Sequence, residues 1–216
     1  TFMMAPIPPV HAGTRNAWQS TREGLRYLRT RQALQGVYIV DINAMVFGMP
    51  RALFPAMAGS VFAGGTITLG LLYAAPGAGA LLMAVVTGWI ARVRRQGRLV
   101  ALVVIAWGAS MALFGLVHVV VVGLICLGVA GAMDVISTVL RNTILQNAIT
   151  DEFRSRISSI QMAVVTGGPR LGDVESGVVA NFTSTEFSIV SGGIACIVGV
   201  LVLMRWRPTF WNRETI

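Results

Sequence analysis

The sequence predicts an all-α membrane protein whose chain crosses a lipid bilayer six times. Three observations predict this fold class. Of the 216 residues, 55% are hydrophobic and only 12% are charged, which is about half the charged fraction of a soluble domain. Beyond Arg31, successive apolar stretches are each close to the ~20 residues that a membrane-spanning helix needs. The 17 basic residues are all arginine and gather between alternate stretches. This composition excludes an ordinary soluble enzyme, a disordered tail and a coiled coil.

Three parts are expected along the chain: a cytoplasmic linker with a basic juxtamembrane helix at 1–31, a six-helix domain at 32–206, and a cytoplasmic tail at 207–216. No secretory signal peptide is expected, because the first part is too polar and proline-rich for one.

The juxtamembrane helix is predicted from a capping box formed by Ser20 and Glu23. It would turn Leu25 and Leu28 toward lipid. Its arginines would face the headgroups: Arg22, Arg26, Arg29 and Arg31. A plain solvated loop is the alternative interpretation of this segment.

The six spanning helices follow in order, and each is a long apolar stretch. We expect them at 33–57, 64–91, 99–117, 119–140, 157–181 and 187–205. The third and fourth are separated only around His118. They must form a tight hairpin, because one helix of about 40 residues would overshoot any bilayer.

The arginines predict the orientation. Fifteen of the 17 fall before the first helix, between the second and third, between the fourth and fifth, or after the sixth. Arg51 lies in an opposite loop and Arg170 lies within a helix. Since basic loops stay in the cytoplasm, we expect a multi-pass protein of the cell membrane with both termini cytoplasmic.

Ionisable and amide side chains mark the helices expected to carry function. The first helix has Asp41 and Asn43, the fourth has Asp134, and the fifth has Arg170, Asp173 and Glu175, whereas no ionisable residue lies within the third and sixth. A charge at membrane depth is costly and should face a protein interior or an aqueous cavity. We therefore expect the first, fourth and fifth helices to surround a polar interior, with the third and sixth facing lipid.

Asp41 is the candidate for proton or substrate coupling, with Asn43 beside it. It lies about 12 Å along its helix, near the bilayer midplane. The alternative is a structural aspartate neutralised by Arg170 or Arg51.

The fifth helix contains Gly167, Gly168 and Pro169, which weaken its hydrogen-bond ladder and allow a bend or a close helix approach. Arg170 and Asp173 are three residues apart and can pair. They are candidates for a gate or for a static ion pair. Asp134 is a candidate lock against Arg141 or against the 92–98 loop, with substrate contact as the alternative.

No catalytic, cofactor or metal motif accompanies these residues. The sequence lacks a nucleophile elbow, a His-Glu-x-x-His zinc motif and a phosphate-binding loop. We therefore expect no enzyme activity, no cofactor and no metal. The basic balance indicates the membrane rather than nucleic acid.

Five segments together resemble the C-terminal half of a major facilitator superfamily transporter, in the enterobactin-exporter-like efflux group. They are DINAMVFGMPRALFP (41–55), GWIARVRRQGR (88–98), RNTILQ (141–146), TDEFRSR (150–156) and GGPRLGD (167–173). The second is similar to the superfamily's cytoplasmic signature loop, carried here by Gly88, Arg92, Gly97 and Arg98. Arg92 stands where the family has an acidic residue.

The resemblance implies half of a twelve-helix fold, itself built from two inverted three-helix repeats. It implies a proton-coupled exporter of siderophore-like or drug-like amphipathic molecules. An N-terminal six-helix half, on the same or a separate chain, would complete it. Two alternatives remain: a non-transporting scaffold or incomplete half-transporter, and, with less support, an intramembrane enzyme.

Overall fold

The chain folds into helices throughout the residues that the computed structural model describes, which are 17–86, 88, 96–206 and 211; no strand occurs among them. In chain order the elements are α1 (Ala17–Thr30), α2 (Gln32–Phe47), η1 (Arg51–Leu53), α3 (Phe54–Ala56), η2 (Met57–Val61), α4 (Thr66–Val86), α5 (Gln96–Leu116), α6 (Val120–Ala148), η4 (Asp151–Phe153), α7 (Arg154–Phe182) and α8 (Thr185–Trp206). The all-α prediction is confirmed. The predicted tail at 207–216 lies outside the described residues, except for Trp211.

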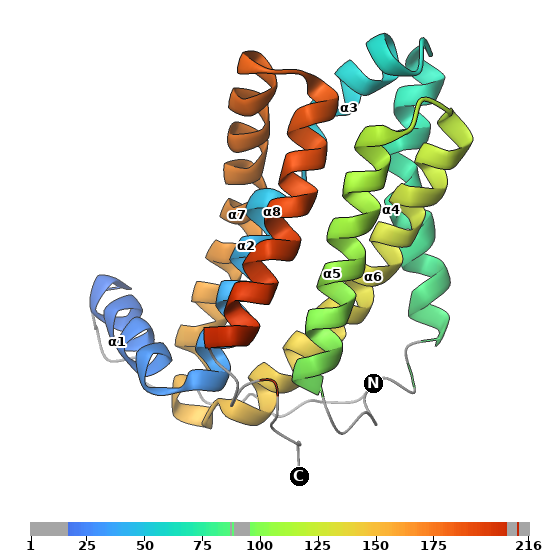
Figure 1. The fold of residues 1–216 in the computed structure, drawn as a ribbon. Coiled ribbons are helices and arrows are strands. Elements are labelled where there is room, and N and C mark those ends of the chain that lie inside the picture. Colours follow the sequence, from blue (N-terminus) through green and yellow to red (C-terminus); the bar gives the residue numbers. More distant parts are fainter. Residues whose placement is uncertain (1–16, 87, 89–95, 207–210, 212–216) are drawn as a thin grey trace, which may run out of the picture.

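The long helices run side by side, with α2, α7 and α8 in one group and α4, α5 and α6 in the other (Figure 1). The helix α1 extends sideways from one end of this bundle, which we call the α1 end. The short elements η1, α3 and η2 lie at the opposite end.

Five candidate membrane spans occur among the described residues: Leu34–Val61, Thr66–Val86, Gln96–Leu116, Val120–Ala148 and Thr185–Trp206. The remaining predicted span, the fifth at 157–181, corresponds to α7, which is a helix of 29 residues. It is not among the five, because Arg154, Arg156, Arg170, Asp173 and Glu175 make it much more polar than the others.

The first predicted helix, 33–57, is not continuous. The helix α2 ends at Phe47, and the chain resumes at Arg51 as a short 3₁₀ turn, one α-helical turn and a π-helical turn. Pro50 explains the break, because proline has no N–H to donate and its ring clashes with the preceding turn. Pro55 lies in the first turn of α3, where a proline is tolerated.

The fourth helix is longer than predicted. It was expected to end at 140, but α6 continues to Ala148 and keeps Arg141 and Leu145 buried. Arg141 is therefore a helix residue, not a loop arginine that reports orientation.

Glycines bring the helix backbones together. A Cβ on Gly131 of α6 would overlap the Pro76 carbonyl of α4, and one on Gly172 of α7 would overlap the Met45 carbonyl of α2. The helices α5 and α8 meet in the same way at Gly108 and Gly193, where a Cβ would come within 3 Å of the facing carbonyl. Small residues allow such close packing in membranes, where apolar lipid gives little hydrophobic drive for association.

The third and sixth predicted helices, α5 and α8, are each exposed on one side, and the contact of that side with lipid stays a prediction. In α5, Leu102, Leu113 and Leu116 are exposed, while its other side packs between α6 and α8. The helix α4 is the least buried of the five candidate spans.

The predicted juxtamembrane helix is present as α1, but its details differ. It begins at Ala17, so Ser20 lies within the helix and is not its cap. Leu25 is exposed, whereas Leu28 is buried in the protein core rather than turned to lipid.

We predict that Gly131→Ala destabilises the bundle, because the added methyl group meets the backbone of α4 rather than a movable side chain. Such overpacking costs about 1–3 kcal/mol. Thermal unfolding of the chain in detergent micelles measures the loss. Gly77→Ala on α4 is the matched control, because nothing lies within 4 Å of its added Cβ. Equal unfolding temperatures for the two variants would contradict the close α4–α6 contact.

Candidate functional site

The polar centre of the bundle is an ion pair between Asp41 of α2 and Arg141 of α6. Their side chains are 1% and 6% exposed. With α2 beginning at Gln32, Asp41 lies about 13 Å along its helix. An isolated charge there would be strongly unfavourable, so each group depends on the other for compensation.

Arg141 also contacts its own helix. Its Nε donates to the Ser137 carbonyl at 3.3 Å, and its Nη2 donates to the Thr138 hydroxyl at 3.1 Å. The same Nη2 lies 3.9 Å from a carboxylate oxygen of Asp134. One guanidinium therefore serves two carboxylates, one fully buried on α2 and one 40% exposed on α6.

The helix α7 reaches this ion pair through Gln161, whose Nε2 donates to the second oxygen of Asp41 at 3.4 Å. Three helices thus meet at Asp41. They are α2, α6 and α7, the helices that the sequence predicts around a polar interior.

A cavity of about 250 Å³ adjoins the ion pair and is lined by Asp41, Asp134, Arg141 and Gln161, together with Arg51 and Trp107. A second cavity of about 440 Å³ lies nearer the α1 end. The two share Asn142, Gln161 and Val165 as lining residues, so they adjoin one another.

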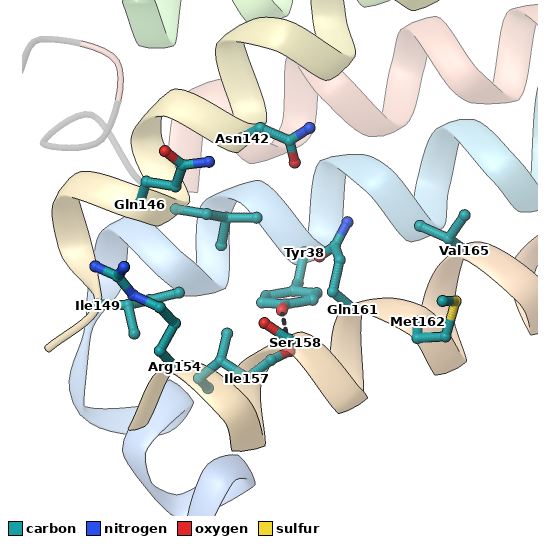
Figure 2. Close-up of a pocket in the computed structure, with 11 residues that line it drawn as sticks. Tyr38, Asn142, Gln146, Ile149, Arg154, Ile157, Ser158, Gln161, Met162 and Val165 are labelled. Carbon is teal, nitrogen blue, oxygen red and sulfur yellow. Dashed lines mark hydrogen bonds between the residues drawn. The ribbon is translucent and has the colours of Figure 1, made fainter. Parts of the chain in front are cut away.

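The second cavity combines amide and hydroxyl groups and the Arg154 guanidinium with apolar side chains. Figure 2 shows Asn142 and Gln146 on α6 facing Ser158 and Gln161 on α7, with Tyr38 of α2 between them. The Tyr38 hydroxyl donates to the Ile157 carbonyl at 3.3 Å. Ile149, Met162 and Val165 supply the apolar part. This lining can bind a molecule that has both hydrogen-bonding groups and apolar parts.

Asp41 is paired with an arginine, as the structural alternative expected, but the two arginines named as examples were wrong. Neither Arg170 nor Arg51 forms an ion pair with it; Arg141 does. The error follows from ending the fourth helix at 140, which placed Arg141 in a loop. Asp134, by contrast, lies against Arg141, which is one of its two predicted partners.

Asn43 does not share the Asp41 site. Its amide donates to the Cys196 carbonyl of α8 at 2.9 Å, and it lines neither cavity. Two residues along a helix turn a side chain by about 200°, which carries Asn43 away from α6 and α7.

Arg170 and Asp173 do not form the predicted ion pair. Asp173 accepts a hydrogen bond from the Ala52 N–H at 2.9 Å, which ties α7 to η1, and Arg170 is exposed. Any gating role for these two residues stays a prediction.

The helix α7 continues through Gly167, Gly168 and Pro169. Gly168 allows a close approach, since its added Cβ would lie 2.8 Å from the Met45 sulfur, while Gly167 has nothing within 4 Å. Pro169 lines the cavity beside Asp41.

The signature-loop residues are only partly visible. Arg92 lies outside the described residues. Gly88 and Arg98 are exposed and Gly97 is buried at the start of α5. The 92–98 loop therefore gives no test of the predicted contact with Asp134.

The sequence analysis missed Gln161, and it named Arg141 only as a partner of Asp134 and not of Asp41. The signal for Arg141 was its apolar surroundings on both sides, since Leu140, Ile144 and Leu145 continue the helix pattern past it. Gln161 carries no comparable signal in the sequence.

The comparisons with known proteins agree with this architecture. A family model described as "Transmembrane secretion effector" matches residues 8–215. The enterobactin exporter EntS of Escherichia coli O81 (strain ED1a) is 28% identical over 199 residues, which cover 92% of this chain and 48% of the relative. EntS proteins of Escherichia coli O139:H28 (strain E24377A / ETEC) and Shigella boydii serotype 18 (strain CDC 3083-94 / BS512) are 27% identical over the same share of each chain. The chain thus spans about half the length of these curated relatives. No solved structure gave a significant match.

We predict that Arg141→Met destabilises the chain more than Asp41→Asn does. Loss of the guanidinium leaves Asp41 buried without its counter-charge, at a cost of about 3–5 kcal/mol. When Asp41 loses its charge, Arg141 still has a counter-charge, because the Asp134 carboxylate lies 3.9 Å away. Unfolding of the chain in detergent micelles measures both values. The double variant should recover part of the loss, and an Asp41→Asn variant that is the less stable of the two single variants would contradict the shared-guanidinium arrangement.

Proposed function

Because the chain belongs to the transmembrane secretion effector family, within the major facilitator superfamily, we propose that it is the C-terminal half of a proton-coupled exporter of small amphipathic molecules. The observation that carries this proposal is the Asp41–Arg141–Asp134 cluster beside a polar cavity, within an apolar, membrane-crossing bundle. Intramembrane ionisable groups that face a cavity are typical of proton and substrate pathways.

Asp41 is the proposed proton acceptor. When Asp41 binds a proton it loses its charge, and Arg141 then has the Asp134 carboxylate as its remaining counter-charge. Proton binding would thus replace a contact between α2 and α6 with one inside α6. A local charge change of this kind can bias two arrangements of packed helices.

The substrate is proposed to enter the 440 Å³ cavity between α2, α6 and α7. Its amide and hydroxyl groups suit a molecule with several acceptors, and its apolar side chains suit the rest of an amphipathic compound. The relatives are named as exporters of enterobactin, which supports a siderophore-like or drug-like substrate and export as the direction. The non-transporting scaffold and the enzyme are not favoured by these relatives.

An N-terminal six-helix half is the proposed partner, on the same or a separate chain. Arg170 is exposed about 24 Å along α7, where lipid contact would be costly. The side of α7 that carries Arg170 therefore needs cover from protein or from a water-filled path. The chain spans 48% of the first relative, which leaves room in such proteins for a second half.

Under this proposal α7 is also a membrane span, the fifth in chain order, which completes the six. Residues 32–206 form one transporter half in the cell membrane, and the α1 end and both termini are cytoplasmic. The helix pairs support two three-helix repeats. In such a repeat, α2, α4 and α5 correspond in turn to α6, α7 and α8. The contact of α4 with α6 then corresponds to that of α7 with α2, and the contact of α5 with α6 corresponds to that of α8 with α2; all four contacts are present. The same correspondence leaves α5–α8 and α2–α6 unchanged, whereas the α7–α8 contact has no comparable counterpart between α4 and α5.

Arg170 and Asp173 are proposed to act in gating at the end opposite α1. The hydrogen bond from Ala52 to Asp173 holds η1 against α7. Breaking it would free the segment that follows the interruption of α2.

We predict that Asp41→Asn abolishes pH-driven efflux by the complete transporter, because asparagine keeps the shape of the side chain but cannot exchange a proton. Efflux is measured in proteoliposomes that carry an imposed pH gradient, with the amount of inserted protein checked separately. Glu152→Gln is the matched control, since Glu152 is an exposed carboxylate that lines neither cavity. Unchanged efflux by Asp41→Asn would overturn the role of Asp41.

A further inference from the structure

The helix α1 is held at a fixed angle to α2. Only Arg31 separates the two helices. The Gln35 side chain of α2 donates to the Arg29 carbonyl at 2.6 Å and thereby binds the last turn of α1. The Arg31 guanidinium lies over the Tyr27 ring, 5.7 Å from its centre.

One face of α1 is docked on the protein. Tyr27 stacks on Phe153 with 4.3 Å between ring centres, and its hydroxyl donates to the Ala148 carbonyl at 3.3 Å. Glu23 pairs with Arg156 at 3.1 Å. Gly24 lies close to α7, since an added Cβ would come 2.9 Å from Ile160. This face is therefore already occupied.

The opposite face carries Arg22, Arg26 and Arg29. Their spacing of four and three residues places them together on one side of the helix, and all three are exposed. None forms an ion pair with a described residue. Glu23 is the only acidic residue in α1, and it is engaged by Arg156. Leu25, 49% exposed, lies next to these arginines.

We propose that the Arg22–Arg26–Arg29 face of α1 binds the headgroups of anionic phospholipids at the membrane surface. Position favours lipid over nucleic acid as the partner. The candidate span that begins at Leu34 follows α1 after a few residues, so α1 must lie close to the bilayer interface. Exposed arginines with an adjacent leucine are typical of a helix that rests among headgroups. This proposal does not depend on the transport function.

The test is lipid binding to the full chain in a neutral detergent, measured by native mass spectrometry during titration with phosphatidylglycerol or phosphatidylcholine. We predict that the chain prefers phosphatidylglycerol and that the triple variant R22Q/R26Q/R29Q binds it at least about tenfold more weakly, since each arginine near an anionic surface contributes about 1 kcal/mol. The variant should fold, because the docked face of α1 is untouched.

The triple variant R22K/R26K/R29K is the matched control and should keep the preference, because it keeps the charge. For the unmodified chain, added salt should weaken phosphatidylglycerol binding. This measurement tests the proposal even if the glutamine variant proves unstable. Three results would overturn the proposal: an unchanged preference in the glutamine variant, equal binding of both lipids, or salt-insensitive binding. Stronger binding of single-stranded RNA than of phosphatidylglycerol would also overturn it.

Discussion

The ion pair between Asp41 and Arg141 is the constraint on which the rest of the structure depends. A buried charge inside an apolar bundle is stable only where an opposite charge meets it. That requirement sets the register of α2 against α6 and explains why α6 must continue past its most apolar part. It also brings α7 into contact through Gln161. The cavities between α2, α6 and α7 lie where these charged and hydrogen-bonding groups converge.

The sequence predicted much of the fold, because membrane crossing is governed by composition along the chain. Five of the six predicted helices are candidate spans, and the remaining one, at 157–181, is the helix α7, whose polar residues are evident in the sequence. The predictions were wrong where one residue outweighed the apolar pattern. Pro50 interrupts an apolar stretch that looks continuous in the sequence. The helix α6 continues through the charged Arg141, where the apolar pattern alone predicted its end.

The candidate site was less predictable, because pairing is a tertiary property. Asp41 could be recognised from its depth in an apolar stretch, but its partner lies 100 positions away and depends on how α6 is turned. Asn43 looked equivalent to Asp41 by position, yet it binds the backbone of α8. Asp173 binds a backbone N–H that becomes available only because the chain is interrupted before Arg51. Sequence spacing contains none of this information.

The glycine contacts bear on how the helices can move. Where Gly131 meets Pro76, or Gly79 meets Gly128, the nearest facing atoms all belong to the backbone rather than to interlocked side chains. Smooth surfaces of this kind can slide by a small amount without side chains changing rotamer, as in shear motions between packed helices. The contact between α2 and α6 is different, because Asp41 and Arg141 fix it by charge. The bundle therefore combines close glycine contacts between backbones with one contact that an ion pair holds. Under the proposed transport function, loss of that ion pair would release the contact between α2 and α6.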